Sequence, residues 1–250
     1  MKGRYNRRWG RMNEVGFGPP AWSPLARAWT AYHLGDSNAA LEVHTDDGGS
    51  EPMPVAVFFR GGGELRGPDR EALRMARGRV LDVGAGVGAL ALLLQETGFS
   101  VTALEVIPQG VEIMRERGVA DPREGRLENL SEEASFDTIL LLMNGTTLVG
   151  SPDGLVRLCR AVADRLAPGG KVLVDSTDLR DDEGGDRRPD GRYVGEIQLQ
   201  LSWRGLRSEP FSVLYADPDL LAACAGEVGL ACRVVERAEG GAYLAELGRG

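Results

Sequence analysis

The chain of 250 residues lacks an excess of positive charge and has no long apolar run. Its formal net charge is −8 at pH 7, whereas a nucleic-acid-binding face needs clustered Lys and Arg to neutralise phosphates. A membrane helix needs about 18 or more consecutive apolar residues, and the sequence contains no such stretch. We therefore expect no nucleic-acid partner and no membrane partner.

Cysteine and histidine are also scarce. The three cysteines, Cys159, Cys224 and Cys232, show no CxxC spacing, which is typical of a reduced, cytoplasmic protein with buried thiols. His33 and His44 are the only histidines, and no cluster of His, Cys and carboxylates at ligand spacing accompanies them. We therefore expect no metal site.

Short apolar segments alternate with helical segments through the middle of the chain. This alternation predicts an α/β fold with a parallel sheet and helices on both faces. The expected strands are 79–83, 100–106, a weaker one near 123–127, 136–144 and 171–176, and the expected helices are 88–98, 108–118 and 151–170.

The flanking segments divide the rest of the chain. Residues 1–24 are basic and without period, so we expect a mobile arm there. In the lid or cap segment 25–78 we expect a helix at 25–34, β-favouring runs on both sides of a turn at 46–50, and a helix at 68–77. In the core, 79–250, a charged loop and a strand form an insertion at about 180–215, and a helix and an antiparallel hairpin close the chain.

A glycine-rich turn follows the first core strand. Gly84, Gly86 and Gly88 let the backbone turn sharply and let a ligand approach without an intervening Cβ. Ligands of open α/β sheets bind beyond the carboxyl ends of the strands, where this turn lies. Glu105 ends the second strand, where a carboxylate can accept hydrogen bonds from ribose hydroxyls. The turn therefore predicts a site for an adenosine-containing cofactor.

Two cofactor classes fit these residues. Gly84, Gly86 and Ala89 satisfy a dinucleotide fingerprint, with Glu105 at nearly the expected distance. Asp82 favours the second class, a sulfonium nucleoside that carries the cationic amino group of a methionine moiety. A carboxylate is repelled by a pyrophosphate, whereas it can bind a cationic amino group. A nicotinamide-dependent oxidoreductase remains the alternative at this point.

Further motifs carry a resemblance to a known family. LDVGAGVG, then Glu105, then FDTILLLMN and the Pro168–Gly169–Gly170 turn in LAPGGKVLVDS resemble the class I S-adenosylmethionine-dependent methyltransferases. PVAVFFR, ILLLMNGTTLVG, VDSTDL and PFSVLYAD are similar to a small, uncharacterised bacterial branch of that family. The resemblance implies a Rossmann-like, doubly wound, mostly parallel seven-stranded sheet, with an N-terminal lid and a β insertion after strand five.

The resemblance also implies a set of site residues. Asp82 would orient the amino group of S-adenosylmethionine, Glu105 would bind the ribose, and the end of strand four would face the transferring methyl. The full expected cofactor set is Asp82, Gly84, Ala85, Gly86, Glu105, Val106, Arg126, Leu127, Met143 and Asn144. Two positions depart from the family pattern, since Arg126 stands where an acid usually bonds the adenine amine and Glu105 replaces the commoner Asp.

Acceptor contacts are expected from the lid and the insertion. The residues are Tyr32, Arg60, Asp178, Tyr193 and Glu196, for each of which an ordinary surface or edge position is the alternative. For Asn144, a turn cap is as good an interpretation as a substrate contact.

The resulting hypothesis is transfer of the methyl group of S-adenosylmethionine to a small-molecule acceptor by in-line displacement, in which positioning does most of the catalysis. No general base can be named from the sequence. The alternatives are the NAD(P)-dependent oxidoreductase and a non-catalytic protein that binds S-adenosylmethionine. The sequence leaves a homodimer open.

Overall fold

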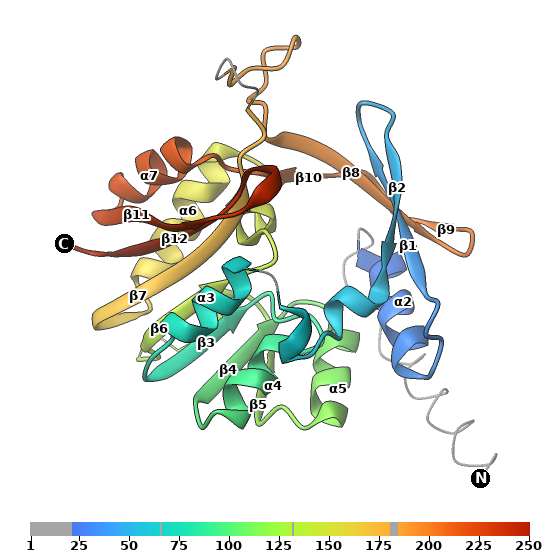
Figure 1. Ribbon diagram of the computed structural model, residues 1–250, viewed down its shortest axis with the longest axis horizontal. Helices are drawn as coiled ribbons and strands as arrows, with labels where there is room; N and C mark the ends of the chain where they lie inside the picture. The colour runs from blue at the N-terminus through green and yellow to red at the C-terminus, as the bar shows by residue number, and fades with distance from the viewer. Residues whose placement is uncertain (1–21, 66, 132, 181–184) are drawn as a thin grey trace.

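A seven-stranded sheet forms the centre of the computed structural model, which describes residues 22–65, 67–131, 133–180 and 185–250. The strand order is β11-β12-β7-β6-β3-β4-β5, with β12 antiparallel to its neighbours and β3 to β7 parallel (Figure 1). This arrangement confirms the predicted α/β class and the mostly parallel sheet. The strands are β3 (Arg79–Val83), β4 (Ser100–Glu105), β5 (Asp121–Glu124), β6 (Phe136–Leu141), β7 (Leu166–Thr177), β11 (Leu230–Arg237) and β12 (Ala242–Arg249).

Helices cover both faces of this sheet. On one face lie α3 (Gly67–Met75), α4 (Ala89–Glu96) and α5 (Pro108–Arg117), and on the other lie α6 (Pro152–Ala163) and α7 (Pro218–Gly226). Side chains cap both helices on the second face, because Ser151 accepts a hydrogen bond from Gly154 N and Asp217 accepts from the first turn of α7. The central strands β3, β4 and β6 are buried on both faces, which explains their continuous apolar runs.

The direction of the strand order reverses at β3. From β3 the chain adds β4 and β5 on one side, and then β6 and β7 on the other side. Open α/β sheets leave a crevice at such a switch point, beyond the carboxyl ends of the strands. The glycine turn after β3 lies at this edge, together with the residues that follow β4, β6 and β7.

A second sheet joins the N-terminal segment to the insertion. Its order is β10-β8-β1-β2, with β9 (Leu206–Arg207) paired to β8, and its members are β1 (Ala40–Thr45), β2 (Ser50–Pro54), β8 (Glu196–Trp203) and β10 (Phe211–Leu214). In Figure 1 the blue β1 and β2 lie beside the orange β8, away from the larger sheet. Helix α2 (Ser23–His33) packs on this sheet, which we call the cap sheet. The sequence predicted strands at β1, β2 and β8, but it predicted neither β9 and β10 nor the pairing of β1 with β8.

Several local predictions need correction. The second β-favouring run ends at Pro54, and Val55–Phe58 form a 3-10 helix, while β2 is an edge strand as its prolines require. The weak strand expected near 123–127 is β5 at Asp121–Glu124. Residues 1–21 of the expected arm lie outside the described part of the chain, and Ser23 already belongs to α2. Helix α3, in the 25–78 segment, packs on β7, β11 and β12.

The Pro168–Gly169–Gly170 turn lies inside β7 rather than before it. Leu166 pairs with Phe136 and Lys171 with Thr138, so these three residues and Ala167 form an irregularity in the ladder, with Gly169 at φ 71°. The turn therefore lies at the predicted residues, but it interrupts β7 instead of preceding this strand.

Candidate active site

The glycine turn has the backbone conformation that glycine alone adopts readily. Gly84, Gly86 and Gly88 have φ values of 72°, 58° and 81°. Gly84 N and Ala85 N both donate to Leu104 O, at 2.9 and 3.0 Å, which ties the turn to the end of β4. The turn therefore lies where the sequence predicted it, beside Glu105.

Glu105 organises the turn through its carboxylate. Oε2 accepts a hydrogen bond from Gly86 N, and Oε1 accepts from Val106 N and Ile107 N, each at 2.8 Å. A carboxylate offers about four acceptor positions, so about one remains for a ribose hydroxyl. Burial raises the pKa of Glu105 to about 7 against the opposing effect of these three amides. Glu105 is thus a structural link as well as a candidate ligand.

Asp82 is a buried carboxyl group at the end of β3. Only 3% of the residue is exposed, and burial, with the charges of Glu105 and Asp69, raises its pKa to about 7. A cationic group placed beside Asp82 would remove much of this penalty, because opposite charge favours the ionised carboxylate. The environment therefore fits a cationic ligand and opposes a pyrophosphate.

The turn after β6 has two non-glycine residues in the left-handed region. Met143 has φ 65° and Asn144 has φ 59°, which is uncommon for such residues and recurs at functional sites. Asn144 Oδ1 accepts a hydrogen bond from Thr177 Oγ1 at 2.8 Å. Asn144 occupies the N-cap position of the 3-10 helix Gly145–Leu148 but makes no side-chain cap bond, so its side chain is used for Thr177 instead.

The residues after β5 lie next to Glu105. Gly125 N donates to Glu105 O at 2.9 Å, and Arg126 and Leu127 follow directly. Leu127 is buried, whereas Arg126 is exposed and its backbone N donates to Asn129 Oδ1 at 2.7 Å. The structure thus brings the predicted adenine side and ribose side together, although it leaves the Arg126 side chain outside the core.

The lid helix α2 contributes a residue that the sequence interpretation missed. A Cβ on Gly86 would lie 3.6 Å from the Trp29 ring, and a Cβ on Gly110 would lie 3.0 Å from it, so Trp29 covers the glycine turn and the start of α5. Trp29 is 3% exposed, and its Nε1 has no hydrogen-bond partner among the described residues. Tyr32, one turn later, packs on Phe59 with ring centroids 4.5 Å apart. Trp29, rather than Tyr32, lies at the turn.

Arg60 meets a carboxylate of the protein itself. Its Nη2 lies 2.9 Å from Asp69 Oδ2, in the first turn of α3, and both side chains are buried. Arg60 Nε has no hydrogen-bond partner in the described part of the chain, although the residue is only 9% exposed. A buried N–H without a partner is costly, so this atom fits a ligand acceptor that the site would receive.

Three other predicted acceptor residues lie in or near a structural network. Asp178 pairs with Arg180 at 2.8 Å, Arg180 Nη1 lies 3.5 Å from Asp217 Oδ1, and Tyr193 Oη donates to Asp217 Oδ2 at 2.5 Å. Tyr193 is 6% exposed and belongs to the core under the seven-stranded sheet. Glu196 begins β8 and is half-buried. These contacts bring Asp178 and Tyr193 to the start of α7, and their action on an acceptor stays a prediction.

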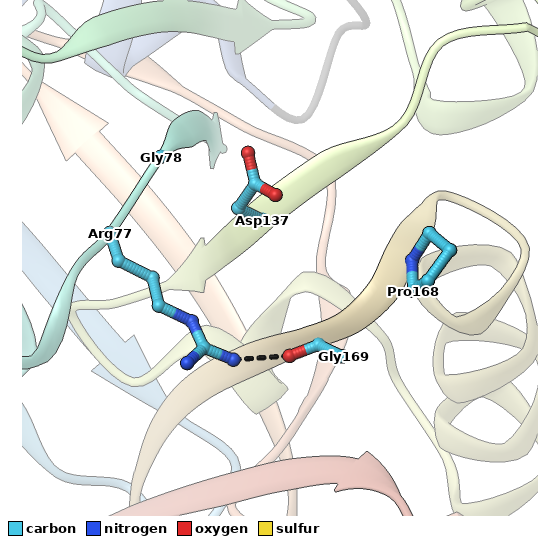
Figure 2. A pocket seen from close by; sticks show the side chains of 5 residues that line it. All are labelled: Arg77, Gly78, Asp137, Pro168 and Gly169. Carbon is cyan, nitrogen blue, oxygen red and sulfur yellow. Dashed lines mark hydrogen bonds between the residues drawn. The ribbon is translucent and has the colours of Figure 1, made fainter.

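Asp175 is a second residue that the sequence interpretation passed over. It lies near the carboxyl end of β7 and accepts hydrogen bonds from the backbone amides of Asn144 and Gly145, the latter at 3.0 Å. A signal for it existed in the sequence, since DST closes the fifth predicted core strand. The depression lined by Arg77, Gly78, Asp137, Pro168 and Gly169 lies at the opposite edge of the sheet, where β3 and β6 begin (Figure 2).

Comparisons with known proteins agree with this geometry. Residues 80–170 match a family model described as a methyltransferase domain. A solved S-adenosylmethionine-dependent methyltransferase from Bacteroides fragilis, in complex with S-adenosyl-L-homocysteine, is 33% identical. The match covers 94% of this chain and 98% of that one, with a TM-score of 0.84. The chain belongs to the class I S-adenosylmethionine-dependent methyltransferases.

Curated relatives of this methyltransferase match over a shorter region. A ubiquinone biosynthesis O-methyltransferase from Xanthomonas euvesicatoria is 37% identical over 111 residues, which are 42% of this chain and 45% of that protein. A cypemycin N-terminal methyltransferase from Streptomyces is 28% identical over 114 residues, 44% of this chain and 46% of that protein. The match therefore spans about half the length of these relatives.

The described residues contain neither a membrane-spanning helix nor a cluster of metal ligands. No helix there has both the length and the apolar character needed to cross a membrane. Within the same residues, no group of three or more His, Cys, Asp or Glu side chains is placed to hold a metal ion.

Proposed function

We propose that this methyltransferase transfers the methyl group of S-adenosylmethionine to a small-molecule acceptor. The observation that carries the proposal is the pair of buried carboxyl groups, Asp82 and Glu105, at the ends of adjacent strands beside a glycine turn. When bound, S-adenosylmethionine supplies a methyl group on a sulfonium, which the lone pair of an acceptor displaces in line.

The residues of the chain fit this cofactor in charge and hydrogen bonding. Asp82 would hold the amino group, and the remaining acceptor position on Glu105 would receive a ribose hydroxyl. Arg60 Nε, buried and without a partner among the described residues, would donate to the carboxylate of the methionine part. The Gly84–Gly86 backbone would line that part. Val106, Arg126 and Leu127 would flank the adenosine.

These residues would contribute to catalysis mainly by positioning the reacting atoms and by excluding water from the site. The Met143–Asn144 turn fixes the wall that faces the reacting atoms, and Thr177 holds the Asn144 side chain in place. Trp29 from α2 covers the glycine turn and keeps water out of it. Alignment of acceptor, methyl carbon and leaving sulfur then lowers the barrier by proximity.

The comparisons support methyl transfer from S-adenosylmethionine, whereas the acceptor, the cellular setting and the oligomeric state are proposals. The names of the two relatives differ, since one is an O-methyltransferase of ubiquinone biosynthesis and the other a cypemycin N-terminal methyltransferase, so they do not identify an acceptor for this chain. The three free cysteines support action in a reducing, cytoplasmic setting. The division into lid, core and insertion, and a homodimer, stay predictions.

Calorimetric titration with S-adenosylhomocysteine tests the proposal, with NADH as the competing ligand. Asp82→Asn and Glu105→Gln should each weaken binding at least about tenfold, because each removes one charge-assisted contact. Glu112→Gln, an exposed change on α5, is the matched control and should bind like the wild type. Binding of NADH in place of S-adenosylhomocysteine would contradict the proposal. Release of S-adenosylhomocysteine from S-adenosylmethionine with a panel of amines, phenols and carboxylic acids separates an enzyme from a non-catalytic binding protein.

A further inference from the structure

The edge of the sheet beside the proposed cofactor site carries a carboxyl group that this site does not use. Asp175 lies on β7, two strands from β3, and is half-buried. Its carboxylate accepts hydrogen bonds from Asn144 and Gly145 amides, which leaves about half of its acceptor capacity. Within the described part of the chain it has no ion-pair partner.

The surrounding charges favour a cation at this place. Asp69 carries a second carboxyl group whose charge acts on Asp175, and Arg60 is paired with Asp69. Burial raises the pKa of Asp175 to about 6, with the charge of Asp69 acting in the same direction and Arg60 and the two amides opposing it.

An apolar rim borders the same place. Met143, Leu148 and Leu179 are 38%, 49% and 38% exposed, and they are the exposed large apolar side chains of the described residues. All three follow β6 or β7 at the carboxyl edge of the sheet. A Cβ on Gly84 would lie 3.0 Å from Leu148, so the rim reaches the glycine turn. Exposed apolar side chains gathered at one edge mark a binding surface.

We infer that the acceptor is an amine with an apolar body, whose ammonium group is held by Asp175 and whose body lies on Met143, Leu148 and Leu179. The inference rests on the proposed methyl transfer and names its acceptor class. Asp175 takes one proton from the ammonium group, and the freed nitrogen lone pair forms the N–C bond to the methyl carbon. The C–S bond breaks with its electron pair on sulfur. The product leaves as a methylated ammonium, and Asp175 returns its proton to water.

The test uses binding rather than turnover, with the full chain saturated by S-adenosylhomocysteine. The probes are n-octylamine, ethylamine, n-octanol and n-octanoate, titrated by calorimetry at pH 7.5. We expect n-octylamine to bind at least about tenfold more tightly than the alcohol, the carboxylate or the short amine, because it alone offers both a charge and an apolar body. Equal or tighter binding of n-octanoate, or no binding of n-octylamine, would overturn the inference.

Variants separate a contact from a structural role. Asp175→Asn keeps an oxygen that accepts from the Gly145 amide but removes the charge, and it should weaken n-octylamine at least about tenfold. Its affinity for S-adenosylhomocysteine should stay within about twofold, as for the exposed control Glu112→Gln. Unchanged n-octylamine binding in Asp175→Asn would overturn the assignment of the ammonium group.

A second variant keeps the inference testable if Asp175→Asn fails to fold. Leu148→Asn changes an exposed side chain and should weaken n-octylamine about fivefold while leaving ethylamine unchanged. Equal loss for both amines, or no loss for either, would remove the apolar rim from the account. Failure of the wild type to bind S-adenosylhomocysteine would overturn the proposed function itself, and the inference with it.

Discussion

The two sheets of this methyltransferase are built in different ways. The seven-stranded sheet grows mainly from segments that follow one another along the chain, and it carries the groups proposed to hold the cofactor. In the cap sheet β1 pairs with β8, with Glu42 opposite Ser202. This long-range pairing joins two groups of neighbouring segments, β1 with β2 and β8 with β9 and β10, so the cap sheet forms when the N-terminal segment and the insertion meet. The comparison suggests that cofactor binding and the covering of the acceptor can be disturbed separately.

The largest effect is expected from a substitution in the seven-stranded sheet, at the proposed cofactor site. Glu105→Ala leaves the amides of Gly86, Val106 and Ile107 without their acceptor. Unsatisfied buried amides cost about 1–3 kcal/mol each, so we expect S-adenosylhomocysteine affinity to fall more than about a hundredfold and the free energy of unfolding to fall by about 3 kcal/mol or more. Calorimetry and urea denaturation measure the two effects. Wild-type affinity in this variant would refute the role of Glu105.

The pH dependence of cofactor affinity tests the same site in the seven-stranded sheet. Burial raises the pKa of Asp82 and of Glu105 to about 7 in the free protein, and a bound amino group would lower that of Asp82. Cofactor affinity should therefore rise with pH up to about 7 to 8 and fall by up to about tenfold per unit below, as protons compete. The free protein behaves oppositely, since both raised pKa values reduce its stability as pH rises from about 4 to 7. Titrations with S-adenosylhomocysteine between pH 5.5 and 8.5 check the profile, and a flat one would contradict it.

Gly195→Ala should disturb the cap sheet alone. A Cβ at Gly195 would lie 1.8 Å from Tyr215 O, so the chain crossing before β8 must move. We expect amide hydrogen exchange in β8 and β10 to speed up about tenfold or more, while β3 and β4 keep wild-type rates. Gly63→Ala is the matched control, because no atom lies within 4 Å of its added Cβ. Equal acceleration in both sheets would show that they unfold as one unit.

The smallest effect concerns the ion pairs that tie the insertion to the β1–β2 hairpin. Asp46 lies 3.1 Å from Arg188 and 2.7 Å from Arg192. Asp46→Asn should lower the free energy of unfolding by at most about 1 kcal/mol, because these pairs are near the surface. Urea denaturation at low and at high salt checks this, since the difference from the wild type should shrink with salt. A loss above about 2 kcal/mol would show that the pairs are integral to the cap sheet.

Local signals explain how much the sequence could predict. The core strands, the caps Ser151 and Asp217, the glycine turn and Glu105 depend on neighbours within a few residues, so pattern and turn chemistry suffice. The pairing of β1 with β8 depends on segments far apart in the chain, and nothing in either segment identifies the other.

Three site residues illustrate the same limit. Trp29 looked like an ordinary helix residue, and its position over Gly86 follows from the docking of α2, which tertiary packing decides. Asp175 lies near the end of a predicted strand, where nothing in the local pattern marks it as a site residue. Its contact with Gly145 N depends on the left-handed turn at Met143 and Asn144 after the adjacent strand. Arg60 was predicted to contact the acceptor, but the carboxylate that it pairs with is Asp69 of the chain itself. Contacts between distant segments therefore account for what the sequence could not predict.

A crystal structure of the protein with S-adenosylhomocysteine tests the central claim most directly. The account predicts the amino group within hydrogen-bond distance of Asp82, a ribose hydroxyl on Glu105, the methionine carboxylate on Arg60, and the sulfur facing Met143–Asn144. Trp29 should lie over the ligand side of the glycine turn. A ligand bound elsewhere, or one whose amino group avoids Asp82, would contradict the account.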